Sequence, residues 1–175
     1  MVLTISNEFG YPILSSILMG FHCLIVSFGV GGSRYGAMSE EYIKKNYPEE
    51  NEAHVKEFGV PIAKGGHPDS GLGRLSDKLD FISWVKLQNA QRAHLNYLET
   101  LTFSMASTLI GGLFYPRITA IAGVIHMVGR QMYASGFKKG GAAGRGKGFA
   151  IIMLTLLVNF VCTIVGAITL LAKKD

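Results

Sequence analysis

Apolar residues in this chain are grouped into long stretches that contain no Asp, Glu, Lys or Arg. Four such stretches are present, at residues 9–33, 100–116, 118–129 and 148–172. The first and last can each cross a bilayer, because about 20 helical residues span its hydrocarbon core. The middle two become long enough when Asn96 and Glu99 join one helix and Arg130 and Tyr133 the next. The pattern predicts an all-α integral membrane protein built as a four-transmembrane-helix bundle.

Composition supports this class and separates out one connector. Of the 175 residues 49% are hydrophobic, and the net charge is +5. Nine of the twelve acidic residues lie between Glu40 and Asp80. We therefore expect one membrane domain over residues 1–175, in which residues 35–80 form a long connector outside the membrane. The cations flank apolar spans and form no basic face with aromatic residues, so nucleic-acid binding is not expected.

Cysteine and histidine give no metal-ligand pattern. Cys23 and Cys162 lie inside apolar stretches, where they are expected to pack as small hydrophobic residues. His54 and His67 of the connector lack the spacing of metal ligands. We predict no metal site.

Three polar residues lie on one face of the second predicted helix where it enters the membrane. Arg92, Asn96 and Glu99 are spaced i, i+4 and i+7. Polar groups at this depth are costly unless they are paired or bind something, so such a column indicates a functional site. The alternative is a helix-end salt bridge that only fixes neighbouring helices.

A second polar cluster should return to the same depth. The connection between the second and third predicted helices, Tyr115-Pro116-Arg117, is very short, which predicts an antiparallel helical hairpin. Arg130 and Tyr133 stand near the far end of its second helix. The two clusters are therefore expected to converge at one membrane face.

A basic, glycine-rich loop is predicted at residues 138–148, before the last helix. Residues 141–147 fit the first part of a phosphate-binding loop, but Gly148 replaces its Ser or Thr and a membrane helix precedes it. Nucleotide binding is therefore not expected. Arg145 or Lys147 either leans over the converged cluster or anchors the loop at the membrane surface. Arg34, after the first helix, has the same two interpretations.

The distribution of Lys and Arg predicts the orientation. The first and third connectors hold most of the cations, whereas the opposite side has Arg117, Lys173 and Lys174. Positive loops face the cytosol, so the converged polar face should open there and both termini should lie on the far side. Several arginines and one glutamate suit a zwitterionic peptide with more than one carboxylate, and a lipophilic partner could enter from the bilayer.

Two motifs carry a resemblance to a known family. Residues 91–99 (QRAHLNYLE) and 129–137 (GRQMYASGF), with four spans, resemble the MAPEG family (membrane-associated proteins in eicosanoid and glutathione metabolism), and within it the microsomal glutathione transferase 3 type. The resemblance covers nearly the whole chain except residues 35–80, a connector longer than expected for the family.

The resemblance implies a homotrimer that binds glutathione between subunits near the cytosolic face, in the endoplasmic reticulum or another organelle membrane. The glutathione-binding residues it implies are Arg34, Arg92, His94, Asn96, Glu99, Arg130 and Tyr133. His94 would act across the subunit interface, and Tyr133 would line the site. Two positions depart from the family pattern: Phe137 stands where many members have a tyrosine and so lacks its hydroxyl, and Thr100 replaces a frequent aromatic residue.

The implied activity is that of a glutathione transferase, with glutathione as co-substrate and no metal. Arg145 or Lys147, with Tyr133, would stabilise the thiolate of glutathione. The thiolate would then attack a lipophilic electrophile or reduce a lipid hydroperoxide. A leukotriene-synthase-like activity is a further reaction that the resemblance implies. The alternative is a non-catalytic MAPEG-fold subunit of a larger membrane complex, prompted by the long connector, Phe137 and Thr100. A channel or carrier is disfavoured, because the last helix offers only Asn159 and threonines as polar groups.

Overall fold

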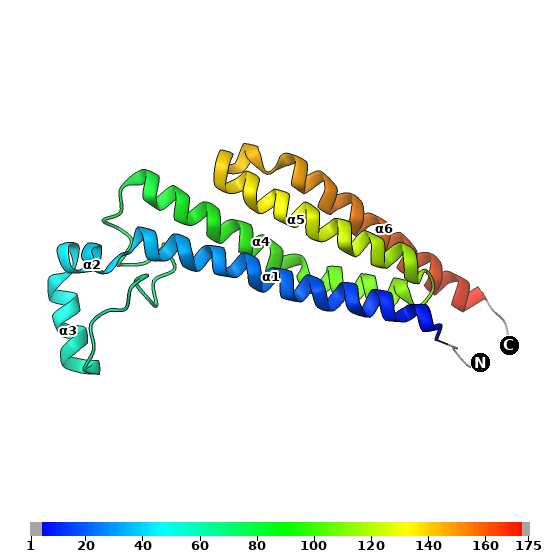
Figure 1. The fold of residues 1–175 in the computed structure, drawn as a ribbon, viewed down its shortest axis with the longest axis horizontal. Coiled ribbons are helices and arrows are strands. Elements are labelled where there is room, and N and C mark those ends of the chain that lie inside the picture. The colour runs from blue at the N-terminus through cyan, green and yellow to red at the C-terminus, as the bar shows by residue number, and fades with distance from the viewer. Residues whose placement is uncertain (1–4, 173–175) are drawn as a thin grey trace. The chain divides into compact units, whose positions relative to one another are not determined.

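The computed structural model describes residues 5–172, and every regular element among them is helical. The elements are η1 (Asn7–Phe9), α1 (Gly10–Ala37), α2 (Glu40–Asn46), α3 (Pro48–Phe58), α4 (Phe81–Gly112), α5 (Pro116–Gly144) and α6 (Gly146–Ala172) (Figure 1). The predicted all-α class is confirmed for this part of the chain. Lys173 and Lys174, which entered the orientation argument, lie outside the described residues.

The chain forms two compact units. The first comprises the residues up to Val26 together with those from Ala93 onward, and the second comprises Ser27–Arg92. Helices α1 and α4 each contribute to both units.

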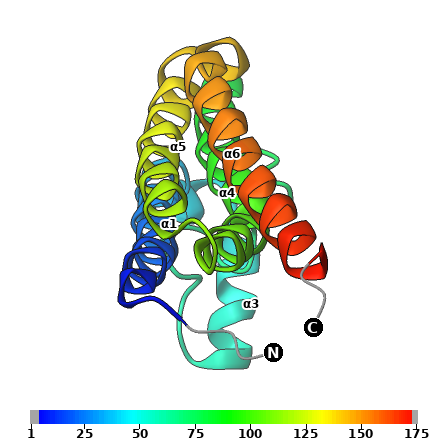
Figure 2. The same ribbon diagram turned by 90° about the vertical axis from the view of Figure 1, so that its right-hand side faces the viewer.

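In the first unit, four long helical segments, from α1, α4, α5 and α6, run alongside one another (Figures 1 and 2). Helices α4 and α5 are joined by a short turn, in which the Tyr115 backbone N–H donates to the Gly111 carbonyl at 2.8 Å. Pro116 then occupies the first turn of α5, where a missing N–H costs nothing. The predicted antiparallel hairpin is therefore present.

Two helices, Asn7–Ala37 and Gly146–Ala172, are long and apolar enough to cross a membrane. Helices α4 and α5 have 32 and 29 residues, which is sufficient length, but they carry more polar residues. Many of these polar side chains are buried within the unit: Ser104, Ser107, Thr108, Thr119, His126 and Arg130. The number of four transmembrane helices stays a prediction.

The polar groups on α4 are paired with groups of α6. The Asn159 side-chain amide donates to Thr108 Oγ1 at 2.7 Å, and the Thr163 hydroxyl donates to the Ser107 carbonyl at 3.1 Å. Hydrogen bonds of this kind join helices where lipid provides no hydrophobic driving force between them.

The region predicted as a glycine loop, residues 138–148, is mostly helical, so that prediction was wrong. Helix α5 continues to Gly144 and α6 begins at Gly146, with only Gly140 and Gly141 leaving helical geometry. Gly141 has φ of 60°, a left-handed conformation that glycine adopts without steric cost. Gly140 and Gly141 together therefore interrupt the helix, and the residues on either side of them are helical.

Helix α1 extends to Ala37, four residues beyond the apolar stretch that ends at residue 33. Within its last turns the Ser33 hydroxyl donates to the Gly29 carbonyl at 3.1 Å. Arg34 lies in the final turn, where a cation is favourable beside the helix carboxyl end. Arg34 also bonds to the connector within the second unit, and such contacts offset the low helix propensity of the glycines.

The connector in the second unit has a hydrophobic core of its own. Its buried members are Met38, Ile43, Tyr47, Ile62, Leu75 and Leu87. The connector begins with the short helix α2, whose N-cap Ser39 side chain accepts from the Tyr42 backbone N–H. Helix α3 was not predicted, although Pro48 in its first turn and Gly59 at its C-cap are ordinary boundary signals.

Asp69 organises the loop that follows α3. Its Oδ1 accepts from the backbone N–H groups of Gly71 (2.7 Å) and Gly73 (2.8 Å). Burial alone would raise the pKa of Asp69, but these donors and the Ser76 hydroxyl outweigh it and lower the pKa. The Trp84 indole N–H donates to the Gly71 carbonyl at 3.0 Å, which connects α4 to the same loop.

Replacing Gly148 by alanine should destabilise the first unit. A Cβ at Gly148 would lie 2.3 Å from the Tyr133 backbone N and 2.7 Å from the Gly129 carbonyl O, so α5 and α6 would have to separate. We expect a loss of about 1–3 kcal/mol, the usual cost of overpacking. Thermal unfolding in detergent measures it, with Gly146→Ala as the control, because a Cβ at Gly146 meets nothing within 4 Å. Equal melting temperatures for the two variants would contradict this packing.

The second unit should loosen in acid through Asp69. A carboxyl with a lowered folded pKa adds stability above its unfolded pKa, about 3.9, and loses that contribution as pH falls through the folded value. Trp84 is the single tryptophan and bonds to the same loop, so its fluorescence reports the change. We expect an acid transition that is reduced in Asp69→Asn and retained in the control Glu57→Gln. An unchanged transition in Asp69→Asn would exclude this carboxyl as its source.

Candidate functional site

The centre of the site is the guanidinium of Arg130 on α5, which is only 2% exposed. Its Nη1 donates to Asn96 Oδ1 on α4 at 2.9 Å, and its Nη2 donates to the Thr100 hydroxyl. The guanidinium carbon also lies 4.7 Å from the centre of the Tyr97 ring. The expected convergence of the two polar clusters is therefore confirmed for Asn96 and Arg130.

His126, one helical turn before Arg130, holds the other side of the guanidinium. Arg130 Nε donates to His126 Nε2 at 3.2 Å, and His126 Nδ1 lies 3.0 Å from Thr155 Oγ1 on α6. Because Nε2 accepts, we assign the imidazole proton to Nδ1, which can then donate to Thr155. The ring is 1% exposed, so this one histidine connects α6 to the arginine of α5.

Tyr97 extends the cluster to α1. Its hydroxyl donates to the Met19 carbonyl at 3.1 Å and lies 3.2 Å from His22 Nδ1. The tyrosine ring at the same time covers one face of Arg130. Each of the four helical segments in the first unit thus contributes a residue to the network around Arg130.

A second cation, Arg145, lies beside Tyr133. Its Nη1 donates to the buried Tyr133 hydroxyl at 3.2 Å, and its guanidinium carbon is 5.5 Å from the centre of the Phe137 ring. Arg145 occupies the single position between α5 and α6. Lys147, the other candidate cation, is exposed in the first turn of α6.

The remaining predicted residues of the first unit, Glu99 and His94, take no part in the hydrogen bonds around Arg130. Glu99 is exposed on α4. His94 is half-buried, and its Nδ1 is shielded from solvent without a hydrogen-bond partner among the described residues. A buried imidazole nitrogen normally has such a partner, so His94 has an unused polar group.

Arg34 and Arg92 belong to the second unit. Arg92 is exposed on α4. Arg34 Nη2 donates to the Gly65 carbonyl at 3.1 Å and also to the Asp69 carbonyl, and it lies 3.2 Å from His67 Nδ1. Arg34 therefore holds the connector loop, a role that its position after an apolar stretch did not indicate.

Sequence reasoning missed His126, and it treated Thr100 only as a departure from a family pattern. Thr100 is in fact a hydrogen-bond partner of Arg130. A signal for His126 was available, because it precedes Arg130 by four residues and stands alone among apolar neighbours. Thr155 carried no comparable signal, since threonine occurs in apolar helices for many reasons.

The network leaves a net positive charge inside the first unit. Within the described residues, the hydrogen-bond partners of Arg130 are neutral: Asn96, Thr100 and His126. Neutral acceptors satisfy the N–H groups without cancelling the charge, so the site attracts anions. Among the described residues no group of His, Cys, Asp and Glu is arranged to hold a metal ion.

Comparison with known families gives one match. The model described as the MAPEG family matches residues 12–165, which is most of the chain and includes parts of both units. The match contains every candidate residue described above.

Removing the Thr100 hydroxyl should destabilise the first unit. Thr100→Val keeps the shape of the side chain but removes the acceptor for Arg130 Nη2, so we expect a loss of about 1.5–3 kcal/mol, typical of a hydrogen bond to a charged group. Thermal unfolding in detergent measures the loss. Thr102→Val is the matched control, because Thr102 is exposed on the same helix. A loss no larger than that of the control would mean that Thr100 does not support Arg130.

Proposed function

The chain belongs to the MAPEG family of membrane proteins, and from this premise we propose that it is a membrane glutathione transferase that also reduces lipid hydroperoxides. The observation that carries the proposal is the buried, uncancelled charge of Arg130 beside Asn96, with Arg145 on Tyr133 in the same unit. Glutathione is an anion with two carboxylates, one amine and one thiol. The site has chemical groups suited to each.

The charged ends of the peptide bind to residues of α4 and α5. Arg130 and Arg92 attract the carboxylates, and Asn96 offers an amide that can donate and accept. Glu99 is exposed and accepts from the amine of the peptide. Arg34 can bind the peptide only if it releases the carbonyls of Gly65 and Asp69. We therefore assign it a smaller part in glutathione binding than the other arginines.

Arg145 activates the thiol. A free thiol has a pKa of about 8.5, and an adjacent cation lowers it so that thiolate forms at neutral pH. Arg145 is held by the Tyr133 hydroxyl, which places it beside two aromatic rings. Phe137 contributes no hydroxyl there, so Tyr133 is the hydroxyl available to the sulfur. Lys147 is the alternative cation.

Two reactions follow from the thiolate. In conjugation, sulfur attacks an electrophilic carbon, a C–S bond forms, and a halide leaves or an epoxide oxygen takes up a proton. In peroxide reduction, sulfur attacks the hydroperoxide, the O–O bond breaks and an alcohol leaves; a second glutathione then attacks the oxidised sulfur, giving glutathione disulfide and water. Neither reaction needs a metal or a nucleophile from the protein.

The assembly we propose is a homotrimer in which the whole chain forms one MAPEG-type domain with four membrane-spanning helices, of the microsomal glutathione transferase 3 type. The unpartnered His94 Nδ1 supports a neighbouring subunit at this place, because such a subunit could supply the missing partner. We place the site on the cytosolic side of the endoplasmic reticulum, where glutathione is available to it.

A second candidate is a non-catalytic MAPEG-fold subunit of a larger membrane complex. The observation in its favour is that Arg130 is already bonded to three neutral side chains, which suits a purely structural role. Calorimetry with glutathione on the purified protein separates the two candidates. Binding supports the enzyme, and absence of binding leaves the structural subunit.

Thiolate formation tests the catalytic step. Glutathione added to the protein at neutral pH should produce the ultraviolet absorbance of a thiolate, and Arg145→Ala should remove most of it while Lys147→Ala retains it. The reason is that both cations are exposed but Arg145 is held in place by the Tyr133 hydroxyl. Loss in Lys147→Ala alone would transfer the role to Lys147. Full absorbance in both variants would exclude activation by either cation.

A further inference from the structure

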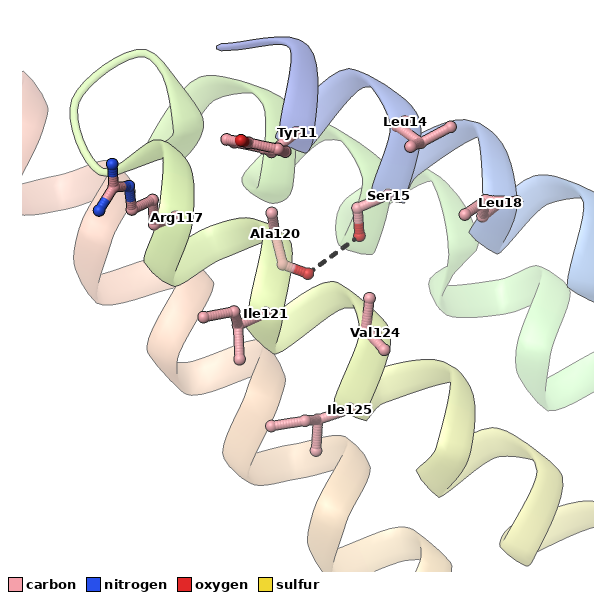
Figure 3. A pocket seen from close by; sticks show the side chains of 9 residues that line it. All are labelled: Tyr11, Leu14, Ser15, Leu18, Arg117, Ala120, Ile121, Val124 and Ile125. Carbon is pink, nitrogen blue, oxygen red and sulfur yellow. Dashed lines mark hydrogen bonds between the residues drawn. The ribbon is translucent and has the colours of Figure 1, made fainter. Parts of the chain in front are cut away.

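A groove lies between the first turns of α1 and those of α5, within the first unit (Figure 3). Its volume is about 470 Å³, within the usual range of ligand pockets. The walls are aliphatic: Leu14 and Leu18 of α1, and Ile121, Val124 and Ile125 of α5. Tyr11 and Arg117 stand at the opposite end from Leu18 and Ile125, so the groove has one polar end and one apolar end.

The groove is separate from the Arg130 site. Its residues on α5 end at Ile125, and Arg117 precedes Arg130 by thirteen residues on the same helix. At 1.5 Å per residue the polar end of the groove lies about 20 Å from Arg130 along the helix axis, and its apolar end at Ile125 lies about 7.5 Å away. The groove residues are also different from those around Arg130 and Arg145. A ligand in the groove therefore does not occupy the proposed glutathione site.

The single polar residue on the inner wall of the groove, Ser15, already has a hydrogen-bond partner. The Ser15 hydroxyl donates to the Ala120 carbonyl at 3.2 Å, which joins the two helices (Figure 3). Because this hydroxyl is occupied, the interior of the groove suits a hydrocarbon chain better than a polar ligand.

The polar end carries a charge pair. Arg117 Nε donates to Glu8 Oε1 at 3.0 Å, and Nη2 donates to the same oxygen. The Arg117 side chain is 73% exposed and the Glu8 side chain 38%. A guanidinium has five N–H donors and a carboxylate two oxygens, so three donors and Glu8 Oε2 are not used in this pair. The groove thus ends at one available cation and one available anion.

Selectivity in such a groove must come from the head group. Lipid tails are as apolar as leucine, so an acyl chain gains little by moving from the bilayer to an aliphatic wall. Charged groups at the membrane surface can distinguish one lipid from another. A cation and an anion side by side match a head group with a phosphate and a primary ammonium.

We propose that this groove binds one acyl chain of an ethanolamine-type glycerophospholipid, with its phosphate on Arg117 and its ammonium on Glu8. The second acyl chain stays in the bilayer. An ammonium donates hydrogen bonds to a carboxylate, whereas a trimethylated choline cannot, so the site prefers ethanolamine to choline. A glycerol head group carries no cation and leaves Glu8 facing only anionic charge.

The test is lipid retention by the full-length protein. We would reconstitute it in nanodiscs of equal parts ethanolamine, choline and glycerol phospholipids and count retained lipids by native mass spectrometry. Val124→Trp fills the groove and should remove the retained ethanolamine lipid. The matched control is Val128→Trp, which is one turn further along the same helix, 53% exposed and not part of the groove. Equal melting temperatures for the two variants establish that both are folded.

The head-group variants complete the test. Glu8→Gln should lower the ratio of ethanolamine to choline lipid about two- to fivefold, the range expected for an exposed charge pair. Arg117→Gln should reduce retention of all three lipids. Retention that is equal in Val124→Trp and Val128→Trp, or independent of head group in the unmodified protein, would overturn the proposal and indicate bulk lipid only. No retained lipid in the unmodified protein would also overturn it and would favour a groove covered by a second copy of the chain.

Discussion

The buried guanidinium of Arg130 is the constraint on which the first unit depends. A cation taken out of water is costly unless its hydrogen bonds are made, and residues of α4 and α5 make those of Arg130. Asn96 and Thr100 lie one turn apart on α4, and His126 lies one turn before Arg130 on α5. Thr155 of α6 reaches the same centre through His126. A shift of any helix by one turn would leave donors unpaired, so the cluster determines how the helices align.

The neutral partners of Arg130 satisfy its hydrogen bonds but do not cancel its positive charge. The same residue can therefore stabilise the fold and attract an anion. A carboxylate in the cluster would have neutralised Arg130 and completed a structural ion pair. The neutral partners instead hold the guanidinium in place while its field remains. Arg145, on Tyr133 of the same helix pair, adds a second positive charge that is more exposed. A ligand with several negative groups would compensate for both.

The sequence predicted those features that follow from local rules. The short turn at Tyr115 and the helical spacing of Arg130 were sufficient to predict that Arg130 returns to the depth of Asn96, although the hydrogen bond between them was not predicted. Sequence reasoning failed where contacts between distant parts of the chain decide the structure. Helix α1 extends to Ala37, and Arg34 in its last turn bonds to the connector. The predicted loop at 138–148 is helical except where the chain reverses. The spacing of His126 from Arg130 was a local signal that was overlooked, whereas its contact with Thr155, 29 residues later, could not be predicted from local rules.

Arg34 illustrates why matching a residue to a family pattern does not by itself define its role. In this chain its guanidinium holds the backbone of a long connector, through the carbonyls of Gly65 and Asp69. Asp69 in turn caps the N–H groups of the next turns, so the charge of Arg34 is used to fold the second unit. To bind a ligand, Arg34 would have to give up these bonds. Arg145 bonds to a side-chain hydroxyl, and the one backbone bond of Arg130, to the Asn96 carbonyl, is long at 3.4 Å. We therefore assign the anion-binding charge chiefly to these two arginines.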